Sequence, residues 1–496
     1  MDQLSITGEI SCCQIVCKTV LLQEAVAEAV VPDSMPDIER ILDAQCALYI
    51  RSRSLENGCV TLEGNIQGTV LYAGEGEDVP LKMEMNLPLT MTAQEEALTD
   101  AESMVVGAAL RSCDAKMIHS RKLQLRAEAA ASVTAFRPGT MDFTMHSEEP
   151  DELETLTDAG EIGYIASVAE KNFVVSDEVT LPGGAPVIDR ILTSRLEANV
   201  QETKPVASKM LLQGEAVLEI VYLSPGEPTI HSSSFAIPFS QIMDMPEEIF
   251  DLASVTLLPT SSFVEPLPGL NGTNSVSAEL HLTAQAVCTA RREISYVADA
   301  YCLRHPCQIE KESRSAFTPF GVTELSQTLS DTVDLPEKGG EVCFAAACAS
   351  VPIFTENTVR LGVTVRVVYR TESGMLFPVS RRLQAEWKRD PAVTECLCSQ
   401  PLIRDVEALI HGDDLELRCS VTIFCLTAGE KTLSYVRAAQ VDAQDSAGFY
   451  DGPSVVVVRP GERSHWELAK QYGSTVALIE AVNTPSGALL LIPRAR

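Results

Sequence analysis

The residues of this chain that could do chemistry are few and lie far apart. No Gly-rich phosphate loop, His-Glu-x-x-His helix or Gly-x-Ser-x-Gly elbow is present. The adjacent carboxylates Glu148 and Glu149 lie in a polar stretch, where nothing would raise a carboxyl pKa for acid–base work. The seven histidines are scattered without the spacing of metal ligands: His119, His146, His231, His281, His305, His411 and His465. We therefore expect no enzyme, and a hydrolase would need a clustered acid–base pair that the sequence does not offer.

The 15 cysteines are not spaced like a disulfide framework, and most lie in or beside apolar runs, where a thiol is usually a small core residue. Cys396 and Cys398 form a tight pair, but no second pair or histidine lies nearby to complete a zinc site, so we expect no metal. The N-terminus has no signal-peptide pattern, and no apolar run approaches the roughly 20 residues that span a bilayer. These features together predict a protein of the reducing cytosol, with no membrane span.

The net charge of −31, from 38 basic and 69 acidic residues, would repel phosphate backbones and anionic lipid, so we expect no nucleic-acid partner. A solvated acidic surface explains most of these charges, and a basic patch on a partner is the sharper alternative. At 496 residues the chain is too long for one core, and three or four domains are expected.

An internal repeat organises the chain. Residues 31–42 read VPDSMPDIERIL, and residues 181–192 read LPGGAPVIDRIL, at a shift of 150. The same shift relates Leu62-Glu63-Gly64 to Leu212-Gln213-Gly214 and Val70-Leu71-Tyr72 to Ile220-Val221-Tyr222. The residues that define the repeated segment are Pro32, Pro36, Ile38, Ile41 and Leu42, and in the second copy Pro182, Pro186, Ile188, Ile191 and Leu192. The chain is therefore a tandem array of one module.

Each module is expected to be β-rich, because alternating apolar residues are separated by turn residues. Residues 60–72 and 82–91 would pair across the turn at 73–78. After each second proline, Ile38 with Ile41 and Leu42 makes an i, i+3, i+4 face, which predicts one or two helical turns. Arg40 and Arg190 are expected to point outward in surface salt links, with a functional role as the alternative.

Polar stretches predict the module boundaries. The acidic run 146–154 is expected to be a solvated linker, and a second break is expected near 311–315. A third unit, 316–445, has a strand at 359–370 that ends in a tyrosine like the earlier copies, but it lacks the proline-bracketed segment.

The tail changes character. Residues 455–461 predict a strand and turn, Ser464 and Thr475 are suited to cap two short helices, and Leu489–Pro493 closes as a strand. This β-α-α-β order resembles a LysM module, and the matching residues are Gly461, Trp466, Leu468, Ala469, Tyr472, Gly473, Thr475, Val476, Asn483 and Leu490 to Pro493. The resemblance implies binding of N-acetylglucosamine polymers between two loops, which here contain Gly461, Glu462, Arg463, Ser464, His465, Asn483 and Thr484. Trp466 is expected to fill the core between helix and sheet, with stacking on a sugar ring as the minority interpretation.

The repeated body resembles the SPOCS family of endospore proteins, in which a Val/Leu-Pro-x-x-x-Pro-x-Ile-x-x-Ile-Leu segment precedes strands that end in Val-x-Tyr. SPOCS units followed by one C-terminal LysM look like spore coat morphogenetic proteins of the SipL and SpoVID type. The resemblance implies action in the mother-cell cytoplasm at the forespore surface. The implied partners are the ATPase of the coat's basement layer and other coat proteins.

The fold class expected is mostly β, with tandem sandwich-like SPOCS modules followed by a small βααβ LysM domain. The expected boundaries are 1–146 and 155–312 for the first two modules, 316–445 for the diverged third module and 449–496 for the tail. The function expected is a non-enzymatic scaffold of the spore coat without cofactors. The alternative is a protein that binds peptidoglycan or another N-acetylglucosamine polymer, with the modules as a spacer.

Overall fold

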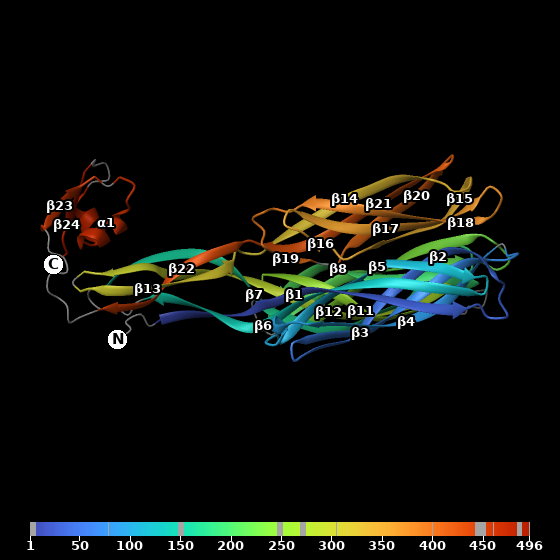
Figure 1. Ribbon diagram of the computed structural model, residues 1–496, viewed down its shortest axis with the longest axis horizontal. Helices are drawn as coiled ribbons and strands as arrows, with labels where there is room; N and C mark the ends of the chain where they lie inside the picture. The colour runs from blue at the N-terminus through green and yellow to red at the C-terminus, as the bar shows by residue number, and fades with distance from the viewer. Residues whose placement is uncertain are drawn as a thin grey trace.

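The computed structural model describes residues 6–77, 79–146, 153–245, 251–267, 274–303, 305–398, 400–441, 453–459, 461–483 and 489–495. Most of these residues lie in β-strands, which confirms that the fold is mostly β. The molecule is elongated, with a head of packed β-sheets at one end, the small tail at the other, and long strands between them (Figure 1).

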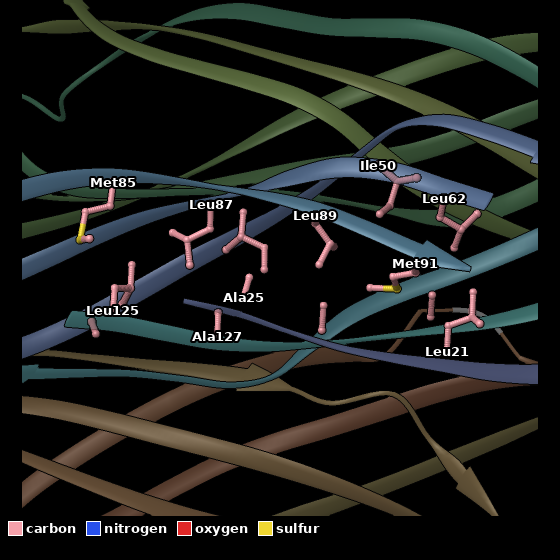
Figure 2. Packing of buried hydrophobic residues seen from close by; sticks show 14 of the residues in the cluster. Leu21, Ala25, Ile50, Leu62, Met85, Leu87, Leu89, Met91, Leu125 and Ala127 are labelled. Carbon is pink, nitrogen blue, oxygen red and sulfur yellow. The ribbon is translucent and has the colours of Figure 1, made fainter. Parts of the chain in front are cut away.

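The first copy of the repeat, here called module 1, is a pair of facing three-stranded sheets. One sheet has the order β2 (Ile38–Glu56), β3 (Cys59–Gly74), β4 (Pro80–Gln94). The other has the order β1 (Ile6–Val30), β6 (Lys122–His146), β5 (Ser103–His119), and the 3-10 turn η1 (Glu96–Leu98) precedes β5. Alternate residues of both sheets point inward, and Figure 2 shows Leu87, Leu89 and Met91 of β4 facing Leu21 and Ala25 of β1.

The second copy, module 2, repeats this arrangement. One of its sheets has the order β8 (Arg190–Val206), β9 (Lys209–Leu223), β10 (Ile230–Asp244), like β2, β3 and β4 of module 1. Its other sheet is β7 (Leu153–Thr180), β12 (Ser275–Cys302), β11 (Leu252–Leu267), and a separate apolar cluster fills the space between the two.

The third unit, module 3, has two four-stranded sheets around a third cluster. One sheet contains β15 (Gly339–Ala349), β16 (Ile353–Phe354), β17 (Thr358–Thr371) and β18 (Leu376–Lys388). The other contains β14 (Gly321–Asp334), β19 (Glu395–Cys398), β20 (Leu402–His411) and β21 (Asp414–Ala428). The division into four folding units with the stated boundaries stays a prediction.

The long strands continue beyond the modules and form a stalk. There β1 pairs with β7 at Cys13 and Ile165. The β1–β6–β5 sheet of module 1 and the β7–β12–β11 sheet of module 2 therefore form one sheet, here called the shared outer sheet. β13 (Cys307–Phe317) and β22 (Glu430–Val441) pair with each other and add to it. The polar residues 311–315, where a break was expected, lie within β13, a strand that is exposed at many positions. The module boundary at this place stays a prediction. Of the expected linker 146–154, residues 147–152 lie outside the described residues.

The segment expected to be helical is extended, which corrects the prediction for Ile38–Leu42 and for its copy at Ile188–Leu192. Ile38 begins β2, Ile188 makes an isolated bridge, and Ile191 and Leu192 lie in β8. In module 1 the register shifts twice, between Ile38 and Arg40 and between Ile41 and Asp43. Such bulges insert an extra residue and change which face the chain presents, so apolar residues spaced three and four apart arise without a helix. Ile38 packs in the core of its own module, whereas Leu42 points away from that core and is buried in a second apolar cluster.

The turn before this bulge is built alike in all three modules. The Val31 N–H donates to the Arg121 carbonyl at 2.9 Å, Leu181 to Asn274 at 2.8 Å, and Leu335 to Asp413 at 2.8 Å. Leu335 is followed by Pro336, as Val31 is by Pro32 and Leu181 by Pro182. The third unit therefore contains a shorter form of the segment that its sequence was expected to lack.

A bulge lies opposite the repeated tyrosine in every module. The residues that pair with the tyrosines are Ile41, Ile191 and Val342, and the bulge adds the residue that follows each of them, Leu42, Leu192 and Cys343. These three residues pack together in one apolar cluster with Leu71, Ala73, Val79, Val221, Leu223, Ile230, Phe344, Val368 and Leu376, here called the junction cluster. Burial raises the pKa of the Cys343 thiol to about 11. Corresponding positions of three modules thus share one core.

Arginines add polar links between modules around the junction cluster. Arg40 of module 1 donates to the Leu376 carbonyl at 3.0 Å and lies 3.8 Å from the centre of the Phe377 ring in module 3. Arg366 lies 3.3 Å from Asp43, and Arg370 donates to the Pro228 carbonyl of module 2 at 2.8 Å. Arg40 also lies 4.0 Å from the Glu39 carboxylate, so the expected salt link is present, and the contacts with module 3 add to it.

One pair of cysteines is joined, although most thiols were expected to be core residues. Cys46 of β2 and Cys113 of β5 form a disulfide. It links the two sheets of module 1, and the pairing could not be expected from two residues 67 positions apart in the sequence.

The glycine repeated in β3 and β9 supplies a prediction, and a glycine of β17 supplies its control. A methyl group on Gly64 would collide with the Tyr49 carbonyl oxygen, and one on Gly214 with that of Asn199. Gly362 of β17 is shifted by one position relative to this register, and the nearest atoms there are 3.2 Å and 3.3 Å away, on Arg382 and Ser350. We expect Gly64→Ala and Gly214→Ala each to cost about 1–3 kcal/mol of unfolding free energy, since overpacking shifts the backbone.

Chemical denaturation followed by far-ultraviolet circular dichroism measures these costs. Gly362→Ala is the control, with a smaller loss expected because a side chain can move aside. Equal losses at all three glycines would contradict the argument from backbone contact.

Candidate functional site

The tail carries the site residues expected from the sequence, and local hydrogen bonds fix its first helix, α1 (His465–Tyr472). Ser464 caps this helix: the Glu467 N–H donates to its hydroxyl at 3.2 Å, and its own N–H donates to the Glu467 carboxylate at 2.8 Å. Gly473 ends it with φ of 64°, a conformation that suits glycine.

The second helix, α2 (Val476–Val482), is capped by the Thr475 hydroxyl. It leads to a two-stranded antiparallel sheet of β23 (Val455–Val458) and β24 (Leu490–Pro493). The predicted β-α-α-β order of the tail is therefore confirmed, whereas its assignment as a LysM stays a prediction. In the described part of the chain, neither helix is long and apolar enough to cross a bilayer.

Most of the candidate loop residues make contacts within the tail. Arg463 donates to the Gln471 side chain at 3.0 Å. Asn483 donates to the carbonyls of Ile479 at 2.7 Å and Leu491 at 2.6 Å, so it ties α2 to β24.

Three other candidates lie at the surface. Gly461 has φ of 59° in the first turn, Glu462 is exposed, and His465 lies 3.6 Å from the Glu480 carboxylate. Thr484 lies outside the described residues. The structure thus brings the start of α1 next to α2 at His465.

Trp466 belongs to the tail's apolar cluster, but it is also the point at which the tail meets the stalk. Its ring packs edge-on against Tyr301 of β12, with centroids 4.8 Å apart. Its indole N–H donates to the Asp299 carboxylate at 2.8 Å. The ring therefore faces the stalk as well as the core of the tail.

Asp299 is the charged centre of this contact. Lys470, one helical turn after Trp466, donates to both of its oxygens at 2.9 and 2.7 Å, and Lys311 of β13 lies 3.1 Å away. Burial raises the pKa of the Asp299 carboxyl, but the hydrogen bonds from Lys470, Trp466 and Lys311 outweigh it and bring the pKa down to about 2. The carboxylate is thus held ionised between tail and stalk.

Tyr301 completes the core of the tail. Its side chain is only 4% exposed and packs with Leu468, Ala469 and Ile479. Its hydroxyl donates to the Ser474 carbonyl at 2.8 Å in a buried position. The tail's fold therefore includes a residue of the stalk.

Sequence reasoning missed Asp299, Tyr301 and Lys311. Trp466 and Lys470 share one face of a helix, but their partner lies 167 and 171 positions away. Nothing in the spacing of residues points to such a contact, so only the fold could find it.

The structure offers little other chemistry. Among the residues that it describes, no group of three or more His, Cys, Asp or Glu side chains is placed to hold a metal ion. Cys396 lies in β19, and the side chain of Cys398 lies outside what is described.

Residues 187–256 match the family model described as SipL, SPOCS domain. They cover the end of the repeated turn, β8, β9 and β10, including Ile188, Ile191 and Leu192. The match supports a SPOCS-domain protein. It covers neither module 1 nor the tail, and Pro182 and Pro186 precede it. No curated protein and no solved structure matches the chain.

The contact of Trp466 with Asp299 predicts a change in fluorescence. In a Trp387→Phe background, Trp466 is the only tryptophan, and Asp299→Ala should shift its emission to longer wavelength, because the ring loses a partner and gains water. We expect a cost of about 2 kcal/mol for docking, the usual size of hydrogen bonds to a charged group. Asp158→Asn, which removes the negative charge beside the Tyr296 hydroxyl elsewhere in the stalk, is the control. An unchanged spectrum in Asp299→Ala would contradict the contact.

The same contact predicts a dependence on pH. The folded-state pKa of Asp299 lies below the unfolded value of about 3.9, so its stabilisation is complete above that value. It is lost as the pH falls from about 4 to about 2. Titration of Trp466 emission should show a transition in this range, and Asp299→Asn should remove it. A transition that persists in Asp299→Asn would show that another group is responsible.

Proposed function

We propose that this protein is a non-enzymatic scaffold of the spore coat, which links coat proteins to the forespore surface through its tail. The observation that supports it is the match of residues 187–256 to a SipL SPOCS domain, which suggests a coat-associated role in sporulation. The partner proposed for the tail is the ATPase of the coat's basement layer, acting in the mother-cell cytoplasm.

The architecture suits such a role. The junction cluster and the shared outer sheet join the modules, so the head is one body with several exposed faces. β12 is 28 residues long and reaches from module 2 to the tail. At about 3.3 Å per residue, a strand of this length spans on the order of 90 Å. A molecule with a head and a tail held apart can contact two layers at once.

The tail's own contacts favour a protein partner over a glycan. Ser464 and Asn483, two of the expected ligand residues, already bind backbone groups within the tail. Exposed aliphatic side chains remain on its sheet, at Val455, Val457 and Leu491. Apolar surface of this kind is typical of protein interfaces.

A pull-down from sporulating cells tests the proposal. The full chain should retain the basement-layer ATPase, and a chain that ends at residue 448 should lose it. The control is the full chain with Val322→Glu, a change to an exposed residue of module 3, which should retain the ATPase.

Titration of the full chain with chitin oligomers and with peptidoglycan tests the glycan alternative. Saturable binding that disappears in the shortened chain, with no ATPase retained by either chain, would overturn the scaffold proposal.

A further inference from the structure

Four aliphatic side chains on β1 are exposed on the outer face of module 1. Val20 is 59% exposed, Leu22 55%, Val26 48% and Val30 66%. They lie at alternate positions of one strand, together with Glu24 and Glu28. Because side chains alternate along a strand, these residues form a single stripe that points away from the module's core.

The other two copies of the module show that the fold does not require this stripe. β7 carries Glu170, Asn172, Ser176 and Thr180 at the equivalent positions, and all four are exposed. The register agrees, because Val20 and Val30 pair with Ser132 and Lys122 just as Glu170 and Thr180 pair with Gln285 and Ser275.

β14 of module 3 is polar in the same places. The positions equivalent to the stripe, counted back from Leu335 as the counterpart of Val31, hold Glu324, Ser326, Ser330 and Asp334. Two of the three copies therefore fold with polar residues at these four positions, and the apolar residues of β1 need another explanation.

Along the same stretch β1 pairs with one strand only, and near its start the Lys18 side chain forms an ion pair with Glu395 of β19. From Gln14 to Val30 β1 pairs with β6 on one side. Among the described residues, the other side is joined to a strand only at the pair Cys13–Ile165. An edge strand that presents both backbone groups and an apolar stripe is a template for one more strand.

The charged residues around β1 indicate what kind of partner strand would bind to its edge. Glu24 and Glu28 alternate with the aliphatic residues, each paired with one cation of β6, Arg126 and Lys122. Glu95, just before η1, and Glu96, its first residue, are exposed, and η1 contacts β1. Asp33 follows the C-terminal end of β1. A second copy of this chain would bring together two edges of like charge and two bodies of charge −31.

We propose that the open edge of β1 binds an extended, basic segment of a partner protein by strand addition. Apolar residues at alternate positions of that segment would pack on Val20, Leu22, Val26 and Val30, and its basic residues would face the acidic groups around the edge. This site is separate from the tail, and it does not depend on the coat role proposed above.

The probe for the test is a short fluorescent peptide that alternates valine and lysine, added to the full chain. Anisotropy should show saturable binding. Hydrogen exchange should show protection of the β1 amides between residues 14 and 30 but not of the β7 amides. A peptide that alternates valine and glutamate should bind more weakly.

The decisive variant gives β1 the residues of β7: Val20→Glu, Leu22→Asn, Val26→Ser and Val30→Thr. It should keep its circular dichroism spectrum, since the sibling strand folds with these residues, and it should bind the peptide roughly tenfold more weakly or worse. Val174→Glu, which removes the exposed aliphatic residue of β7, is the matched control and should bind like the wild type.

Three results with the peptides would overturn the proposal. They are equal binding by the grafted chain and the wild type, protection of β7 in place of β1, and equal binding of the acidic and basic peptides. Sedimentation that shows a dimer of the wild-type chain without peptide, with β1 protected, would assign the edge to a second copy and would also overturn it.

Discussion

The burial of three bulge residues in one apolar cluster is the constraint on which the architecture depends. Leu42, Leu192 and Cys343 each follow the residue that pairs with a buried tyrosine, and the bulge turns each of them away from its own module. An apolar residue that leaves its own core must be buried elsewhere. The three modules bury these residues together in the junction cluster. The tandem modules therefore form one packed head. The arginine contacts of Arg40, Arg366 and Arg370 then fix how the modules face one another.

The stalk follows from the length of the strands, and the tail depends on the stalk. β1, β6, β7 and β12 each continue beyond the sandwich to which they contribute. Near its end β12 supplies Asp299 and Tyr301, one as an ionised acceptor and the other as a core residue of the tail. The tail is therefore packed on the body and is not simply tethered to it. Several of its expected ligand residues, Ser464 and Asn483 among them, stabilise its helices.

The strands, the hairpin turns and the β-α-α-β tail could be predicted from the sequence, because alternation, turn residues and helix caps are local signals. The extended structure of Ile38–Leu42 could not be predicted, because two bulges give its apolar residues the same three- and four-residue spacing that a helix would. The third copy of the proline turn was missed because it is shorter and retains only Leu335-Pro336 of the pattern. The contact of Trp466 with Asp299 has no local signal at all. By contrast, the apolar stripe of β1 stands out only when the three copies are compared within one register, where Val20 aligns with Glu170 and Glu324.

The most direct test of the junction is native-state hydrogen exchange of the chain with Leu192→Asp. A charge there would disrupt the cluster without touching the cores of modules 1 and 3. We expect faster exchange in β3 and β17 as well as in β9, because all three strands face the shared cluster. Faster exchange confined to module 2, with β3 and β17 unchanged, would contradict a head held together by this junction.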